Sequence, residues 1–185
     1  MWKLRVHSIK TDNASVPDKV FLRQKATENL AELRVLDLYA GENILWRHFE
    51  TRRYYGVEIV KGKGKNLHGD CKRVIDALDL SGFNVIDCDS YGIPFGVILK
   101  IFGNKTLQKG TVIVYTAISN KMSGVSKECV KMFGLERIYK KSITLVAAKA
   151  HELFYAMLEK HKVKTVHYYK VSGNFEKHYG YFVVQ

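Results

Sequence analysis

Polar residues that could do chemistry follow four predicted strands of this chain, at the point where each strand ends. They are Asp37, Tyr39, Gly41 and Asn43 after the first strand, Glu58 after the second, Asp70 and Cys71 after the third, and Asp89, Ser90, Tyr91, Gly92 and Pro94 after the fourth. A glycine turn lets a ligand approach the backbone closely, and Glu58 follows Gly41 at about the interval at which nucleotide folds place a carboxylate for ribose hydroxyls. An acid near an aromatic ring, as in Asp89 and Tyr91, suits an amino group on a flat ring.

A parallel sheet would bring these residues together, because the carboxyl ends of its strands meet at one edge. The predicted strands are Arg34–Tyr39, Tyr54–Ile59, Asn66–His68, Phe83–Asp89, Gly110–Ile118, Thr165–Val171 and Tyr179–Val184. The predicted helices are Asp18–Leu33, Asn43–Thr51, Cys71–Leu78, Pro94–Leu107, Ser126–Phe133 and Ser142–His161. The alternation predicts a three-layer α/β sandwich around a mostly parallel seven-stranded sheet with an antiparallel C-terminal edge strand.

The N-terminal segment, residues 1–33, is expected to form a strand at Trp2–Lys10 and a helix, both packed on a domain formed by residues 34–185 in a single globular unit. Pro17 and Asp18 mark the start of that helix. Its apolar stripe is predicted from Val20, Phe21, Ala26, Leu30 and Leu33, and its water-facing side from Arg23, Lys25 and Glu28.

The composition points to a polyanionic partner. The formal net charge is +12, and the stretch from Lys121 to Gln185 holds twelve Lys and Arg against five Glu and no Asp. Such an excess is typical of nucleic-acid-binding proteins, although a solvated basic surface is the alternative. No run of about 18 apolar residues predicts a membrane span. Three widely spaced Cys without a Cys-x-x-Cys pair argue against a disulfide framework and a zinc site, so no metal and a cytoplasmic location are expected, and Met1–Arg5 lacks the apolar core of a signal peptide.

Three segments resemble successive motifs of one enzyme family: Val-Leu-Asp-Leu-Tyr-Ala-Gly-Glu-Asn, Tyr-Gly-Val-Glu and Asp-Ser-Tyr-Gly-Ile-Pro. They are similar to motifs of class I S-adenosylmethionine-dependent methyltransferases, which have a Rossmann-like fold, and the resemblance covers roughly Arg34 to Ile118. It implies S-adenosylmethionine as the cofactor. By resemblance to the DLFAGSG-type loop of RNA and DNA base methyltransferases, Asp37, Tyr39, Gly41 and Asn43 would surround the methionine part, Glu58 the ribose, and Asp70 and Cys71 the adenine amino group.

The fourth polar segment resembles the (Asp/Asn)-Pro-Pro-(Tyr/Phe) motif of enzymes that methylate exocyclic amines, and still more the Asp-Pro-(Phe/Tyr)-Gly-Ser-Pro variant of tRNA guanine-N2 methyltransferases. The resemblance implies Asp89 and Tyr91 as catalytic residues, with Ser90, Gly92 and Pro94 as substrate-binding neighbours. A conjugated amine is a poor nucleophile, so Asp89 and a backbone carbonyl should hold its hydrogens and follow the developing positive charge. Tyr91 would stack on the base, which is worth about 1 to 3 kcal/mol. The expected substrate is a base in tRNA or rRNA, with RNA favoured over DNA.

Other interpretations stay open at this stage. The same fold could act on DNA adenine, protein or a small molecule, or the chain could be a catalytically silent nucleic-acid-binding relative, for which Asn43 and Ser90 depart from the family pattern. A nicotinamide-dependent oxidoreductase is disfavoured because no G-x-G-x-x-G is present. Asp87 is expected to pack or pair structurally, and the basic loop Lys61–Lys65 to be a solvated turn. The sequence predicts no oligomeric state.

Overall fold

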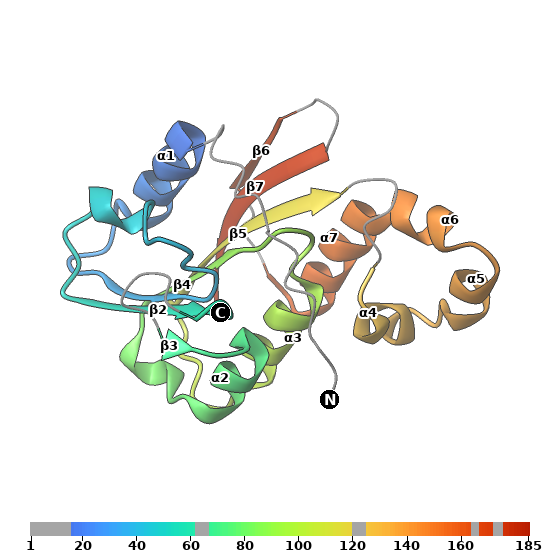
Figure 1. The fold of residues 1–185 in the computed structure, drawn as a ribbon, viewed down its shortest axis with the longest axis horizontal. Helices are drawn as coiled ribbons and strands as arrows, with labels where there is room; N and C mark the ends of the chain where they lie inside the picture. The colour runs from blue at the N-terminus through green and yellow to red at the C-terminus, as the bar shows by residue number, and fades with distance from the viewer. Residues whose placement is uncertain (1–15, 62–66, 120–124, 164–166, 172–175) are drawn as a thin grey trace.

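The structure is a computed structural model that describes residues 16–61, 67–119, 125–163, 167–171 and 176–185. Within them, seven strands form one sheet in the order β3-β2-β1-β4-β5-β7-β6 (Figure 1). The strands are β1 Arg34–Asp37, β2 Arg53–Glu58, β3 Leu67–His68, β4 Val85–Asp89, β5 Val112–Ser119, β6 His167–Val171 and β7 Glu176–Val183. The strand predicted at Trp2–Lys10 and most of the Lys61–Lys65 loop lie outside the described residues.

The first five strands of the chain pair in parallel, and the last strand, β7, is antiparallel to both of its neighbours. The predicted mostly parallel, seven-stranded sheet with antiparallel pairing at its C-terminal edge is therefore confirmed, with the antiparallel strand β7 one position in from the edge. β7 pairs with β5 on one side, and β6 lies outside it at the edge. The antiparallel member is possible because β6 and β7 are consecutive in the chain and form a hairpin-like pair.

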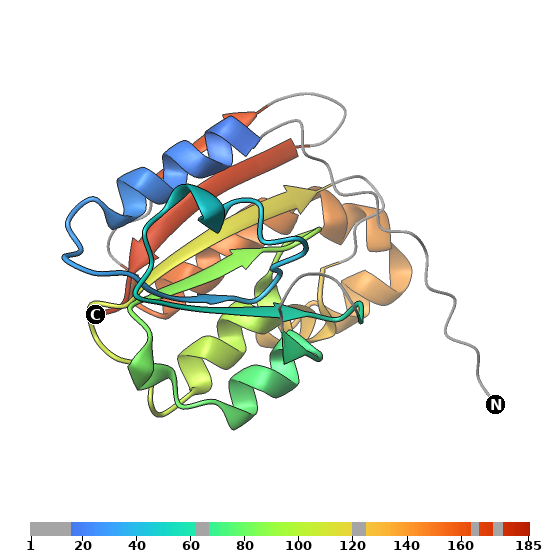
Figure 2. The same ribbon diagram turned by 60° about the vertical axis from the view of Figure 1, so that its left-hand side comes forward.

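Helices cover both faces of the sheet (Figure 2). They are α1 Val16–Thr27, α2 Cys71–Ala77, α3 Phe95–Gly103, α4 Lys127–Met132, α5 Glu136–Lys141, α6 Ile143–Ala148 and α7 Ala150–Lys160. Two 3-10 turns, η2 Trp46–His48 and η3 Leu80–Gly82, lie in the connections. None of the helices described here is long and apolar enough to cross a membrane.

The two faces of the sheet have separate cores. On one face, α2, α3, α4 and α7 bury a large cluster that includes Ile75, Ile98 and Phe154. On the other face, α1 and the connection from β1 to β2 bury a smaller cluster around Leu22, Trp46 and Tyr179. Because side chains alternate along a strand, Val85, Asp87 and Asp89 of β4 face α1, whereas Ile86 and Cys88 face the larger cluster.

The structure corrects the predicted orientation of α1. Phe21, assigned to the apolar stripe, is 53% exposed, and Arg23, assigned to water, is 0% exposed. The inward stripe is Lys19, Leu22, Arg23 and Ala26, a spacing of i, i+3, i+4 and i+7 in which two members are basic. The helix also ends at Thr27 rather than Leu33, and the Thr27 hydroxyl donates to the Arg23 carbonyl.

Two other predicted helices differ from those observed. The segment Asn43–Thr51 contains only the turn η2, because Asn43 has a left-handed backbone (φ 61°) that a continuing helix cannot contain. The helix predicted at Ser142–His161 is divided at Lys149 into α6 and α7. The Lys149 amide donates to Val146, an i to i+3 bond that ends α6, and both helices then bury their apolar sides.

Candidate active site

A cavity of about 420 Å³ lies at the carboxyl ends of β1, β2 and β4. This edge is the switch point of the sheet, because the chain leaves β1 toward β2 on one side while β4 pairs on the other. Ligands of open α/β sheets bind at such a point. Its volume falls within the range of about 300 to 1,000 Å³ that is usual for small-molecule sites.

The glycine turn after β1 forms one wall of the cavity and is held by Glu58. Gly41 has a φ of 52°, a conformation that side-chain-bearing residues rarely adopt, and the Asn43 amide closes the turn by donating to the Ala40 carbonyl at 2.7 Å. The Gly41 amide donates to Glu58 Oε2 at 3.0 Å, and the Val60 amide donates to Oε1 at 2.9 Å. Since a carboxylate can accept about four hydrogen bonds, Glu58 retains capacity for hydroxyl donors.

Asp37 and Asn43 meet below the cavity, at the hydroxyl of Tyr54. This hydroxyl lies 3.0 Å from Asp37 Oδ2 and 3.1 Å from Asn43 Oδ1, yet it has a single hydrogen to donate. Two arrangements satisfy both contacts. In one, a protonated Asp37 donates to Tyr54, which then donates to Asn43 Oδ1; in the other, the Asn43 amide is turned over, so that its nitrogen donates to Tyr54 and Tyr54 donates to an ionised Asp37. Neither Asp37 nor Asn43 lines the cavity, so the side chain of Asn43 does not crowd a ligand there.

The charges around Asp37 favour its protonated form. Burial raises the pKa of Asp37 to about 8, and the neighbouring carboxylate of Asp87 adds to this shift, while Arg23 opposes it. Asp37 and Asp87 are direct partners on adjacent strands. This buried group holds three carboxyls, Asp37, Asp87 and Asp89, and two cations, Lys19 and Arg23. One proton on Asp37 makes the group electrically neutral.

Arg23 of α1 is the buried cation of this face. Its Nε donates to Asp87 Oδ2 at 2.7 Å, and its NH2 lies 2.6 Å from the same oxygen. The indole of Trp46 donates to that oxygen at 2.7 Å and lies under the guanidinium, with 5.8 Å between Cζ and the ring centroid. Asp87 therefore has a structural role, as predicted from the sequence. Through Arg23 it binds α1 to the sheet, and through Trp46 it binds the β1–β2 connection.

Asp89, the predicted amine acceptor, reaches the cavity from the end of β4. Lys19 Nζ lies 2.8 Å from its Oδ2, and the two side chains are only 14% and 11% exposed. Burial alone would raise the pKa of Asp89, but Lys19 and Arg23, helped by the Thr116 hydroxyl, lower it overall. Asp89 is therefore a carboxylate near neutral pH and can accept hydrogen bonds.

The turn after Asp89 presents an aromatic ring to solvent. Tyr91 is 67% exposed at the cavity, and Gly92 has a φ of 137° that glycine alone adopts readily. Ser90, which stands where the family motif has proline, donates from Oγ to the Gly92 carbonyl at 3.0 Å. This bond restrains the turn in place of a proline ring. Pro94 is buried and precedes α3, whose Ile98 amide donates to its carbonyl.

The third polar segment lies beside the cavity rather than in it. Asp70 is the N-cap of α2 and accepts from the Lys72 amide at 2.8 Å. Burial raises the pKa of the Cys71 thiol, while the nearby hydroxyl of Tyr39 opposes this shift, and Tyr39 itself lines the cavity. Burial raises the pKa of Tyr39, as do the nearby thiols, so the phenol stays protonated and is a donor.

The structure thus brings seven of the predicted site residues to one cavity: Tyr39, Gly41, Glu58, Asp89, Ser90, Tyr91 and Gly92. The other five, Asp37, Asn43, Asp70, Cys71 and Pro94, support it from behind or beside it. The sequence reasoning missed Lys19 of α1 and Lys177 of β7, both of which line the cavity. Lys19 stands four residues before Arg23 on the same helix face, so it could have been found only together with the burial of Arg23, which the sequence did not indicate.

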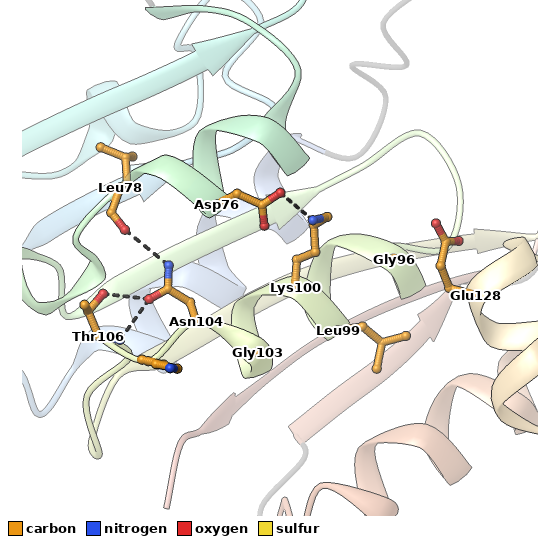
Figure 3. Close-up of a pocket in the computed structure, with 10 residues that line it drawn as sticks. Asp76, Leu78, Gly96, Leu99, Lys100, Gly103, Asn104, Thr106 and Glu128 are labelled. Carbon is orange, nitrogen blue, oxygen red and sulfur yellow. Dashed lines mark hydrogen bonds and ion pairs between the residues drawn. The ribbon is translucent and has the colours of Figure 1, made fainter.

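A second hollow of about 570 Å³ lies on the opposite face, between α2, α3 and the start of α4 (Figure 3). Its polar groups are engaged with one another: Lys100 pairs with Asp76, and Asn104 donates to the Leu78 carbonyl while accepting from Thr106. These bonds join α3 to α2. The hollow lies away from the strand ends that carry the predicted site residues, so the cavity at the switch point is the candidate active site.

No family model matches the sequence, and neither does any curated protein. Solved structures do resemble the chain. A putative methyltransferase, yhhF from Escherichia coli, has a TM-score of 0.55 at 10% identity over 92% of this chain and 85% of its own. A SAM-dependent methyltransferase from Archaeoglobus fulgidus has a TM-score of 0.55 at 13% identity over 90% and 93%. TYW2 of M. jannaschii, solved in complex with AdoMet, has a TM-score of 0.53 at 14% identity over 98% and 80%.

At these identities the likeness establishes the fold. The chain has the Rossmann-like α/β fold of S-adenosylmethionine-dependent methyltransferases, as the motifs implied. The agreement extends over nine-tenths of this chain or more in each of the three comparisons.

Proposed function

We propose that this protein is an S-adenosylmethionine-dependent methyltransferase that acts on an exocyclic amine of a nucleic-acid base, with RNA favoured over DNA. The observation that carries the proposal is the placement of an ionised acid, Asp89, and an exposed aromatic ring, Tyr91, beside the glycine turn and Glu58 in one cavity. The residues that would hold the methyl donor and those that would hold the methyl acceptor therefore line the same cavity.

The residues present fit the cofactor. Glu58 keeps lone pairs for ribose hydroxyls while its backbone partners fix its position, and the open turn at Gly41 leaves room for the methionine part. Ile44, Leu45, Ile59 and Val60 give the same cavity apolar walls for a flat adenine ring. When bound, S-adenosylmethionine supplies an electrophilic methyl group. Within the part of the chain that the structure describes, the Gly41 and Val60 amides donate to the Glu58 carboxylate, so two backbone groups orient it.

On the substrate side, Asp89 would accept a hydrogen of the target amine and stabilise the positive charge that develops on its nitrogen. The lowered pKa of Asp89 keeps it ionised for this task. Tyr91 would stack on the base, and its exposure means that it can receive a ring from solvent. The formal charge of +12 would attract the polyanionic strand that carries the base.

The test is transfer of tritiated methyl groups to total RNA, total DNA and total protein by the wild-type chain. The proposal expects label in nucleic acid, with more in RNA. Label in protein alone would contradict the assignment of the substrate, and label in none of the three, together with retained RNA binding, would favour a catalytically silent relative.

The Asp89→Ala variant sharpens this test. It should lose transfer about 100-fold or more, the scale of a general acid–base contribution, while affinity for S-adenosylmethionine changes little. A parallel loss of cofactor affinity would show that Asp89 holds the cofactor rather than the amine.

A further inference from the structure

Lys19 shares its carboxylate partner with the proposed substrate amine. Asp89 Oδ1 is shielded from solvent, so a donor that enters the cavity can reach only Oδ2. That same oxygen is the one 2.8 Å from Lys19 Nζ. An amine held by Asp89 must therefore lie next to the Lys19 ammonium, and two donors on one oxygen lie about 4 to 5 Å apart.

This arrangement constrains the atom beside the amine. The ammonium of Lys19 has three hydrogens, of which the bond to Asp89 uses one. A ring atom bonded to the amine-bearing carbon, on the Lys19 side, falls within hydrogen-bonding reach of the ammonium. An unprotonated ring nitrogen at that place would accept from Lys19, whereas an N–H would meet a cation that is also a donor.

We propose, resting on the function proposed above, that Lys19 is a specificity residue that selects an amino group next to an unprotonated ring nitrogen. Adenine, with N6 beside N1, and cytosine, with N4 beside N3, present this edge. Guanine presents N1–H beside its amine on the Watson–Crick edge, and its only acceptor next to the amine, N3, is on the edge that carries the ribose. The guanine-N2 substrate implied by the closest sequence motif is thus disfavoured in this chain, because α1 places a lysine where guanine would need an acceptor.

The first experiment identifies the modified nucleoside after transfer to total RNA and total DNA, by mass spectrometry of the digests. The inference expects methylation of the adenine or cytosine amine. Methylation of the guanine amine would overturn it and leave the proposed function intact. No methylated base in either nucleic acid would overturn both.

The second experiment asks whether Lys19 contacts the ring nitrogen. On the substrate strand found above, replacing the target adenosine by 1-deazaadenosine, or cytidine by 3-deazacytidine, should lower kcat/KM of the wild type by about 10- to 100-fold, the scale of a hydrogen bond to a charged group. Lys19→Met should lose a similar factor on the natural base and show no further loss on the deaza base. An equal deaza effect in Lys19→Met would overturn the inference.

Matched variants separate specificity from folding. Lys19→Arg keeps a cationic donor and should retain part of the discrimination between natural and deaza bases. Lys25→Met removes a lysine from the same helix, where it forms an exposed pair with Glu28, and should behave as wild type. If Lys19→Met melts earlier than wild type, the comparison of its two rates on natural and deaza bases still decides the inference, because both rates come from the same folded fraction.

Discussion

Replacing Asp37 by Asn tests the conclusion that this carboxyl is protonated in the folded protein. The pKa of Asp37 is raised to about 8 from an ordinary value of 3.8, chiefly by burial and then by Asp87. Between those two values the folded chain holds a proton that the unfolded chain has released, so Asp37 makes stability fall as pH rises from about 4 to about 8, by up to about 1.4 kcal/mol per pH unit.

Asn imitates the protonated acid without titrating. At pH 7 the variant avoids the cost of protonating a carboxyl about three units above its ordinary pKa, which is about 4 kcal/mol. Its amide can accept from the Tyr39 amide and donate to Tyr54, but its second hydrogen needs a new partner, which costs about 1 to 2 kcal/mol. We therefore expect Asp37→Asn to be more stable than wild type by about 2 to 3 kcal/mol at pH 7.

The assay is urea denaturation of both proteins at several pH values between 5 and 9. Burial also lowers the pKa of His161, which makes stability rise with pH near 6, and taking the difference between the two proteins cancels that contribution. The difference should grow with pH up to about 8 and then level off. An Asp37→Asn variant that is less stable than wild type at pH 7, with a difference independent of pH, would refute a protonated Asp37.

Three further predictions concern the surrounding network and the substrate side. Arg23→Met leaves Asp87 buried without its cation and should lower the free energy of unfolding by about 3 to 5 kcal/mol in urea, whereas Lys25→Met, at an exposed pair, should stay within about 0.5 kcal/mol; similar losses in both would argue against the buried pair. Ser90→Ala removes the bond to the Gly92 carbonyl and should lower kcat with little change in cofactor affinity, and unchanged kinetics would mean that the turn needs no such restraint. Tyr91→Ala should raise KM for nucleic acid about 10-fold or more while Tyr91→Phe stays near wild type; a large loss in Tyr91→Phe would point to the hydroxyl instead of stacking.

The sheet and its functional edge were predictable because their signals are local. The strands Arg34–Asp37, Val85–Asp89 and Val112–Ser119 are rich in apolar residues and mostly buried, and each of the first two ends in the acid that the sequence reasoning selected. The glycine turn could be found for the same reason. The backbone conformation at Gly41, with a φ of 52°, favours glycine, so the residue type at that one position indicates the turn.

The face of the sheet under α1 was not predictable from those rules. Arg23 looks like a solvent residue on any helical projection, and its burial is set by Asp87, which is 64 residues further along the chain. Once Arg23 turns inward, Phe21 must turn outward, so one long-range ion pair reversed the expected stripe. The inward position of Lys19 has the same cause. Lys19 lies one helical turn before Arg23, and it pairs with Asp89, two residues after Asp87 in β4.

The central claim is that the cavity at the switch point binds S-adenosylmethionine through Glu58 and holds the substrate amine at Asp89. Calorimetric titration of S-adenosylmethionine and its demethylated product into wild type, Glu58→Gln and Asp89→Ala tests it directly. We predict binding to wild type and Asp89→Ala with similar affinity, and binding about 10-fold or more weaker to Glu58→Gln, because the amide keeps one acceptor oxygen and loses the charge. Absence of binding to wild type at millimolar cofactor, or equal affinity in Glu58→Gln, would contradict the claim.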